Sequence, residues 1–277
     1  MRAIKAKPLS GLTVWLRTDQ RRRPPRGAAP VAVLACVAFL LLAGCTSPPP
    51  ASNNNTTAPP PGTTPPPNGG QTGGTCTNNG VTTGTAPPSD APKQGTVRVA
   101  MQTSKGNITL KLYGDDAPVT VANFVGLARA GYFDCQRFHR VIKDFMDQGG
   151  DPLSKDPAQA ARWGTGGPGY NIKDEFACND GTISEALPAD CAQHDGLKYD
   201  FDEATGLLAM ANTGRPHTGG SQFFLTASKP NWLDGRHTIF GEVEQGMDVV
   251  TAINTAPTAT GDRPNPEILL IKVTVVG

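Results

Sequence analysis

The sequence lacks the patterns of several common functional sites. It contains no Cys-x-x-Cys pair, and its four histidines are scattered without helical spacing, so it predicts no metal site. It also lacks a Lys/Arg stripe in residues 95–277, where 16 basic and 22 acidic residues give a net charge of −6. An acidic domain binds a phosphate backbone poorly, which argues against nucleic acid as a partner.

A hydrophobic run of membrane-spanning length is also missing from the N-terminal region. The apolar run at residues 31–44 has 14 residues, too few to cross a bilayer core of about 30 Å. Residues 1–44 carry eight Lys and Arg against Asp19 alone. A basic region followed by a short apolar run is typical of a signal peptide.

The apolar run ends in Leu42-Ala43-Gly44-Cys45, which resembles the lipobox of bacterial lipoproteins. The resemblance implies that residues 1–44 are a lipoprotein signal peptide and that Cys45 carries lipid after cleavage. The protein would then be extracytoplasmic and anchored to a bacterial membrane. The alternative is an ordinary secretory signal, or a buried helix, with a chance cysteine.

Large aliphatic residues are nearly absent from residues 45–94, where Val81 is the only one. Of these 50 residues, 39 are Pro, Gly, Thr, Asn or Ser. Such a stretch cannot bury enough apolar surface to offset the entropy lost on ordering. We therefore expect a disordered tether over residues 45–94 and one folded domain over residues 95–277.

Export would place the remaining cysteines in an oxidising compartment. Four are left once the signal is removed and Cys45 is acylated: Cys76, Cys135, Cys178 and Cys191. Cys178 and Cys191 flank a polar stretch of 12 residues, and this short separation favours a disulfide between them. Cys76 and Cys135 are then either paired or free, and pairing of Cys135 with Cys178 or Cys191 is the alternative.

Hydrophobic periodicity predicts many short strands and two helices. Strands are expected at residues 97–103, 107–112, 138–142, 207–211, 222–226, 237–243 and 268–276. Pro118 opens a helix over residues 119–130 that Gly131 ends, and a second helix is expected over residues 247–253. This order favours a mainly β fold, a closed antiparallel barrel plugged by helices.

Four sequence blocks carry the chemical signal. They are FHRVIKDFMDQGGD at 138–151, LLAMAN at 207–212, GGSQFFLT at 219–226 and WLDGRHTIFGEV at 232–243. Together, and in this order, they resemble the cyclophilins, a family of peptidyl-prolyl cis-trans isomerases. The resemblance covers residues 96–276 and implies an eight-stranded barrel capped by two helices, no cofactor, and an outer groove for X-Pro segments. We also expect a monomer.

The resemblance assigns site residues within these blocks. It implies a catalytic group of Arg140, Phe145, Gln148 and His237. It implies a substrate-binding group of His139, Met146, Ala211, Asn212, Gln222, Phe224, Trp232 and Leu233. Trp232 also matches the family position that contacts the inhibitor cyclosporin. On a strand, His139 points to the face opposite Arg140, so we expect it to orient the site.

Arg140 is the expected catalytic donor. Twisting an X-Pro bond removes amide conjugation and leaves an electron-rich prolyl nitrogen, which a hydrogen-bond donor stabilises. A guanidinium stays charged and presents several rigid N–H groups. The predicted activity is therefore isomerisation of X-Pro bonds in exported proteins. The alternative is a proline-peptide-binding or chaperone module with little turnover.

The chain also departs from the cyclophilin pattern. Asp144 and Asp147 are expected to put negative charge beside the pocket, and residues 178–196 form an insertion. Residues 164–169 satisfy G-x-G-x-x-G but lack the flanking strand and helix of a dinucleotide site. We expect this loop to border the groove instead.

Overall fold

The computed structural model describes residues 76, 95–186, 191 and 196–276. The predicted signal peptide, Cys45 and, apart from Cys76, the predicted tether lie outside these residues. The helices are α1 (Pro118–Arg129) and α2 (Met247–Asn254), with 3-10 helices η1 (Pro152–Lys155), η2 (Pro157–Arg162) and η3 (Asn231–Leu233). Among the helices described, none has the length and apolar character needed to span a membrane.

The described chain is mainly β and centres on one large antiparallel sheet. Its order is β3-β13-β1-β2-β10-β8-β9-β5-β4. These strands are β1 (Thr96–Thr103), β2 (Gly106–Tyr113), β3 (Gln136–Arg137), β4 (Arg140–Ile142), β5 (Met146–Gly149), β8 (Leu207–Met210), β9 (Phe223–Thr226), β10 (Ile239–Gln245) and β13 (Leu269–Val275). Two short ladders stand apart: β6 (Phe176–Ala177) with β7 (Ile183–Ser184), and β11 (Thr258–Ala259) with β12 (Arg263–Pro264).

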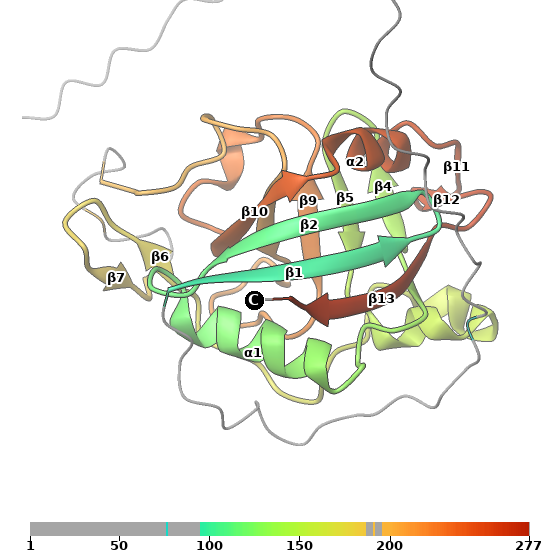
Figure 1. The fold of residues 1–277 in the computed structure, drawn as a ribbon, viewed down its shortest axis with the longest axis horizontal. Helices are drawn as coiled ribbons and strands as arrows, with labels where there is room; N and C mark the ends of the chain where they lie inside the picture. Colours follow the sequence, from blue (N-terminus) through green and yellow to red (C-terminus); the bar gives the residue numbers. More distant parts are fainter. Residues whose placement is uncertain (1–75, 77–94, 187–190, 192–195, 277) are drawn as a thin grey trace, which may run out of the picture. The chain divides into compact units, whose positions relative to one another are not determined.

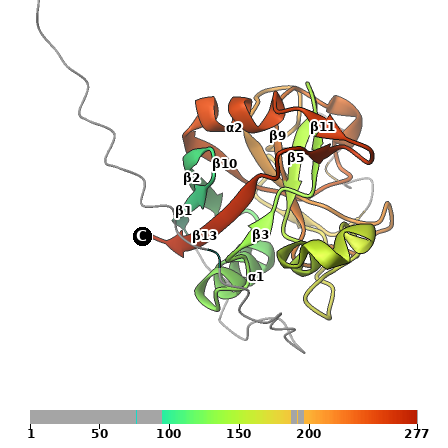
Figure 2. The same ribbon diagram turned by 90° about the vertical axis from the view of Figure 1, so that its right-hand side faces the viewer.

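The sheet is curled and has nine strands, which corrects the expected closed eight-stranded barrel. Its edge strands β3 and β4 are separated in the chain by Phe138 and His139 alone, so the two edges must come close together. Figure 2 shows β3 beside β13 at one of these edges. No ladder joins β3 to β4 in the part of the chain that the structure describes. The single strand expected over residues 138–142 is therefore wrong at Phe138 and His139.

The two helices plug the interior of the curled sheet. Figure 1 shows α1 and α2 on opposite sides of the β1–β2 hairpin. Both helices contribute to one buried cluster with the inward side chains of the sheet, through Val121, Phe124 and Val125 of α1 and Val249, Val250 and Ile253 of α2. The two predicted helices are confirmed to within a residue at each end.

The predicted stop signal of α1 is confirmed. Gly131 has a φ of 67°, a left-handed conformation that glycine adopts without strain. Its N–H donates to the carbonyl of Ala128, and the N–H of Tyr132 donates to that of Leu127, both at 3.0 Å. These bonds satisfy carbonyls that the helix end would otherwise leave free.

The N-terminus of α1 is capped by a residue from a distant loop. Ala117 at the N-cap offers no side-chain hydrogen bond. The buried carboxylate of Glu175 accepts from the backbone N–H groups of Val119 at 3.0 Å and Thr120 at 2.8 Å, and from the Thr120 hydroxyl at 2.7 Å. Burial raises the pKa of Glu175, and its hydrogen bonds to Thr120 and Val119 oppose that rise.

Asp147 faces the core rather than the pocket, so the expectation that it charges the pocket is wrong. Its side chain is fully buried, and its Oδ1 accepts from Asn254 Nδ2 at 2.8 Å. Asn254, the last residue of α2, also donates to the Ile142 carbonyl at 2.9 Å and accepts from the Asp144 N–H at 2.8 Å. Burial raises the pKa of Asp147 from 3.8 to about 7, with the Asn254 bond opposing the rise.

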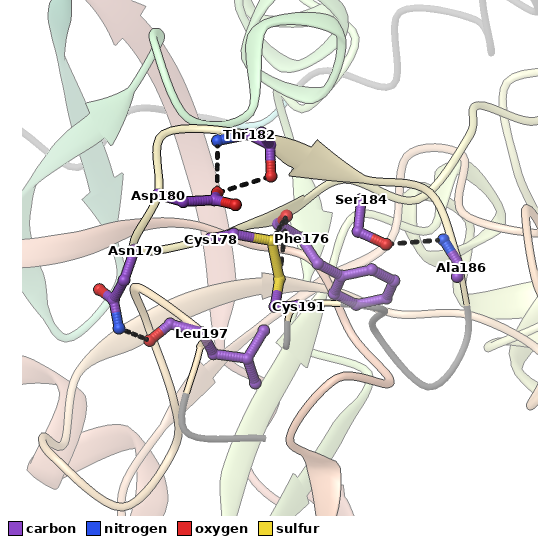
Figure 3. Close-up of a disulfide and its surroundings, with 9 residues drawn as sticks. All are labelled: Phe176, Cys178, Asn179, Asp180, Thr182, Ser184, Ala186, Cys191 and Leu197. Carbon is purple, nitrogen blue, oxygen red and sulfur yellow. Dashed lines mark hydrogen bonds between the residues drawn. A yellow bond between two sulfur atoms is a disulfide. The ribbon is translucent and has the colours of Figure 1, made fainter. Parts of the chain in front are cut away.

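The insertion is held at its base by the disulfide that the short loop favours, Cys178–Cys191 (Figure 3). Both cysteines are buried, and their sulfur atoms lie 3.6 and 3.9 Å from the Phe176 carbonyl oxygen. Asp180 accepts from the Thr182 N–H at 2.9 Å and its hydroxyl at 2.7 Å, which closes the β6–β7 turn. A second disulfide joins Cys76 to Cys135, with Cα atoms 5.3 Å apart.

Asp147→Asn should raise stability in a pH-dependent way. A raised pKa means that the folded state holds the proton more tightly than the unfolded chain, so wild-type stability falls as the pH rises from about 4 to about 7. The neutral variant lacks this loss, which is at most about 1.4 kcal/mol per pH unit. Urea unfolding at several pH values measures the free energy of unfolding. The difference between Asp147→Asn and wild type should grow up to about pH 7 and stay constant above it. Exposed Asp144→Asn on the same hairpin is the control, and an equal pH profile for Asp147→Asn and wild type would contradict this account.

The double change Cys178→Ser and Cys191→Ser should lower the free energy of unfolding. Opening a loop of this length restores roughly 3 kcal/mol of unfolded-state freedom in the entropic model. The expected result is a lower melting temperature with the sheet's amide spectrum retained. Unchanged melting, or peptide mapping that joins Cys178 elsewhere, would show that the bridge does not stabilise the domain.

Candidate active site

Because side chains alternate along the strands, polar and apolar side chains from four neighbouring strands form one row on the outer face of the sheet. Across β4, β5, β9 and β8, Arg140 pairs with Gln148, Gln148 with Phe224, and Phe224 with Ala209. The residues that alternate with them face the core and are buried: Val141, Asp147, Phe223 and Leu225. Because side chains on a strand alternate between faces, one register places the whole row outward.

A pocket of about 240 Å³ lies over this row. Nine of the twelve residues expected at the site line it: Arg140, Phe145, Met146, Gln148, Ala211, Asn212, Phe224, Leu233 and His237. The other three, His139, Gln222 and Trp232, lie outside this lining. The structure therefore gathers most of the predicted site into one concave surface.

The floor of the pocket belongs to a second hydrophobic cluster, distinct from the main core. Met146 and Phe224 are buried there with Phe201, Ala209 and Ile239 beneath them. Phe145, Ala211 and Leu233 pack partly buried around the floor. A rigid apolar slot of this kind suits a small hydrophobic ring.

Two aromatic contacts complete the walls. The His237 ring stands nearly perpendicular to Phe224, with centroids 5.4 Å apart. Trp232 packs on Phe145 with centroids 5.6 Å apart, yet it remains 62% exposed. Trp232 thus supports the wall from outside the lining and presents a large apolar surface beside it.

His237 is oriented by a backbone hydrogen bond. Its Nδ1 lies 2.9 Å from the Met210 carbonyl oxygen, and since a carbonyl can only accept, Nδ1 carries a proton. Burial lowers the pKa of His237, with the bond to Met210 opposing that change. The ring is therefore a neutral, fixed wall of the pocket at neutral pH.

Arg140 is the only Asp, Glu, Lys or Arg among the residues lining the pocket. Its side chain is 45% exposed, its Nη1 donates to Gln148 Oε1 at 3.4 Å, and its Nε lies 3.5 Å from Asp262 Oδ2. Gln148 Nε2 in turn donates to Gln222 Oε1 at 2.9 Å. Gln222 Nε2 then donates to the carbonyls of Gly164 and Gly166 at 3.0 and 2.8 Å. We call this chain of donors, from Arg140 through Gln148 and Gln222, the polar relay.

A larger groove of about 720 Å³ adjoins the pocket. The two share Gln148, Ala211 and Asn212, and the groove extends along the loop of residues 164–171. That loop therefore borders the groove, as expected. The Asn212 side chain joins two loops, donating to the Arg236 carbonyl and accepting from the Gly214 N–H, each at 2.9 Å.

Asp151 is a functional-site residue whose role the sequence analysis missed. Its buried carboxylate accepts from the N–H groups of Leu153 at 2.7 Å, Gly164 at 2.5 Å and Gly166 at 3.3 Å. It thereby fixes the two glycines whose carbonyls end the polar relay. An aspartate directly before Pro152 is a local signal for the cap of a 3-10 helix, and Asp151 is the N-cap of η1. Nothing in the local sequence indicates its hydrogen bonds to the distant Gly164 and Gly166.

His139 is buried and does not line the pocket, and the strand expected to orient it does not extend over this residue. It is only 4% exposed, and neither ring nitrogen has a hydrogen-bond partner among the described residues. Burial, aided by the charge of Arg140 and opposed by that of Asp151, lowers its pKa from 6.5 to about 4. A neutral, buried His139 packs near Gly164 and has no direct access to the pocket.

The described residues contain no group of three or more His, Cys, Asp or Glu side chains placed to hold a metal ion. The pocket presents the guanidinium of Arg140 above an apolar floor, beside the Gln148 amide, which is already hydrogen-bonded to Arg140 and Gln222. Such a set can bind an uncharged ring and donate hydrogen bonds to it. It has no side chain arranged as a nucleophile with an adjacent base.

The comparisons with known proteins agree with this arrangement. A family model described as cyclophilin type peptidyl-prolyl cis-trans isomerase/CLD matches residues 98–275. Peptidyl-prolyl cis-trans isomerase-like 1 of Neurospora crassa is 43% identical over 178 residues, which cover 64% of this chain and 93% of that protein. The human protein of that name is 42% identical over 174 residues, or 63% of this chain and 89% of that protein.

Solved structures show the same fold. A cyclophilin-type isomerase of Cryptosporidium parvum has a TM-score of 0.54 and 28% identity, covering 66% of this chain and 99% of that one. A structure of that protein in the presence of the dipeptide Ala-Pro has a TM-score of 0.53 and 28% identity, covering 65% and 99%. The match of family model, relatives and fold places this chain in the cyclophilin-type peptidyl-prolyl cis-trans isomerase family.

Proposed function

We propose that residues 95–277 isomerise X-Pro bonds of exported proteins, with the proline ring in the pocket and Arg140 as the catalytic donor. One observation carries this proposal: a charged guanidinium stands at the rim of an apolar slot formed by Met146 and Phe224, with Phe145 and Leu233 beside it. The slot matches the ring, and the donor matches the nitrogen that becomes electron-rich on twisting.

The reaction breaks no covalent bond, so its barrier comes from lost conjugation. That barrier is about 18–20 kcal/mol, and uncatalysed X-Pro bonds relax in tens to hundreds of seconds. Shortening about 100 s to about 1 ms requires removing roughly 7 kcal/mol. A donor that binds the twisted prolyl nitrogen better than the planar amide contributes selectively to the transition state.

The pocket floor holds the proline ring in place, and the polar relay holds the Gln148 amide in place. Phe224 and Met146 immobilise the ring, so rotation is confined to the residue that precedes proline. The polar relay fixes the amide of Gln148, whose Oε1 accepts from Arg140 and whose Nε2 is already committed to Gln222. Residues flanking X-Pro would extend into the larger groove, which has no Asp, Glu, Lys or Arg in its lining.

The membrane location rests on the sequence. The basic region, the apolar run and Leu42-Ala43-Gly44-Cys45 come in the order of a lipoprotein signal, and the family match begins only at residue 98. The Cys76–Cys135 disulfide attaches the predicted tether to the domain at residue 76, so residues 45–75 would separate lipid and domain. A flexible linker of that length spans about 30 Å.

Arg140→Ala should leave the domain folded and lower turnover of an Ala-Pro peptide roughly 10²- to 10³-fold, the scale for losing one transition-state donor. Arg140→Lys should rescue little, because an ammonium does not reproduce the planar fork. NMR exchange spectroscopy measures both rates. Lys143→Ala, at an exposed cation on the same hairpin, is the matched control. Near-normal exchange in Arg140→Ala would refute the mechanism. A wild type that binds the peptide but turns it over negligibly would favour the alternative, a binding module.

Cys45→Ser should release the protein into the aqueous phase or leave it unprocessed in cells that make it, because lipid cannot be attached to serine here. Detergent partitioning of wild type and variant measures this. Cys36→Ser is the control, since this cysteine lies within the predicted signal and should leave partitioning unchanged. A wild type that partitions into the aqueous phase would exclude the anchor without affecting the isomerase proposal.

A further inference from the structure

Arg140 is contacted by a carboxylate from outside the four sequence blocks. Its Nε lies 3.5 Å from Oδ2 of Asp262, in the connection between β11 and β12. The two side chains are 45% and 50% exposed, so solvent screens their attraction. An ion pair between exposed groups contributes little to folding, but it can still restrict the direction of the Arg140 side chain.

The backbone places Asp262 independently of this ion pair. In the β11–β12 hairpin, Ala259 pairs with Arg263, and Gly261 and Asp262 have φ angles of 78° and 58°. Aspartate is among the residues that adopt this left-handed region most readily. The carbonyl of Asp262 accepts from the N–H of Val141, the residue after Arg140, at 2.7 Å. Asp262 is thus attached to β4 next to the residue that its side chain contacts.

Two side chains therefore contact adjacent parts of one guanidinium. Asp262 lies at Nε, and Gln148 Oε1 accepts from Nη1 at 3.4 Å. Neither contact uses Nη2. A half-exposed arginine has many accessible rotamers, so a donor of this kind needs fixed partners if it is to meet the twisted prolyl nitrogen in a defined orientation.

We infer that Asp262 is a positioning residue that orients the guanidinium of Arg140 towards the bound X-Pro bond. The carboxylate acts through Arg140 and touches no substrate itself, since it does not line the pocket. The attraction between its negative charge and the guanidinium holds Arg140 in one direction, so a neutral side chain at position 262 would hold it less firmly. The inference rests on the proposed role of Arg140.

Asp262→Asn is the test variant, because asparagine also tolerates a positive φ and keeps the backbone bond to Val141 while removing the charge. We expect kcat for an Ala-Pro peptide to fall about three- to tenfold with KM nearly unchanged, as for a misaligned donor. The matched control is Glu244→Gln. Glu244 forms an ion pair with the exposed Arg98 at 2.8 Å, with side chains 30% and 51% exposed, and it does not contact Arg140. Its loss should leave kcat within about twofold.

A double-mutant cycle separates this inference from the proposed function. In the Arg140→Ala background, Asp262→Asn should cause no further loss, because its effect requires the guanidinium. The Arg140 Nε–H resonance should also shift and exchange faster in Asp262→Asn than in wild type. An unchanged or higher kcat in Asp262→Asn, an effect on KM alone, or an equal loss in the Arg140→Ala background would overturn the positioning role. If Arg140→Ala alone turned over normally, the proposed function itself would fail.

Discussion

The alternation of side chains along β4, β5, β9 and β8 is the constraint on which the rest of the structure depends. One register places Arg140, Gln148 and Phe224 in a row on the outer face and places Val141, Asp147 and Phe223 in the core. A slip of one residue in any of these ladders would exchange the two sets. The core that stabilises the curled sheet and the pocket on its outside are therefore fixed by the same hydrogen bonds. This arrangement ties the integrity of the site to the stability of the sheet.

Buried carboxylates connect the sheet to the segments around it. Glu175 caps α1, Asp147 contacts the end of α2, and Asp151 holds the groove loop. Each costs desolvation, and each is partly compensated by N–H donors on another segment. Apolar residues could fill the same volumes, but they could not accept hydrogen bonds from specific N–H groups. The carboxylates thus determine where the helices and the groove loop lie, at some cost in stability.

The sequence predicts the regular part of this structure well and the long-range polar contacts poorly. The β1–β2 hairpin and both helices follow from periodicity and from Pro118 and Gly131, whose effects are local. β5 was missed because its inward residue is Asp147, which breaks the apolar alternation that marks a strand. The site residues came from the family resemblance. No local pattern indicates the cap by Glu175 or the ion pair of Asp262, since each partner lies far away in the chain.

The exposure of Arg140 follows from the kind of reaction proposed for it. Isomerisation turns one half of the substrate relative to the other, so a site that enclosed both halves would block the motion it should accelerate. The slot can hold the proline ring, while the preceding residue needs open space and the donor must stand at the boundary between them. A donor in that position is not packed on all sides, and its direction must come from hydrogen bonds and charges. The polar relay and Asp262 meet this need from different segments of the chain, which lets Arg140 stay solvent-accessible and still point in a defined direction.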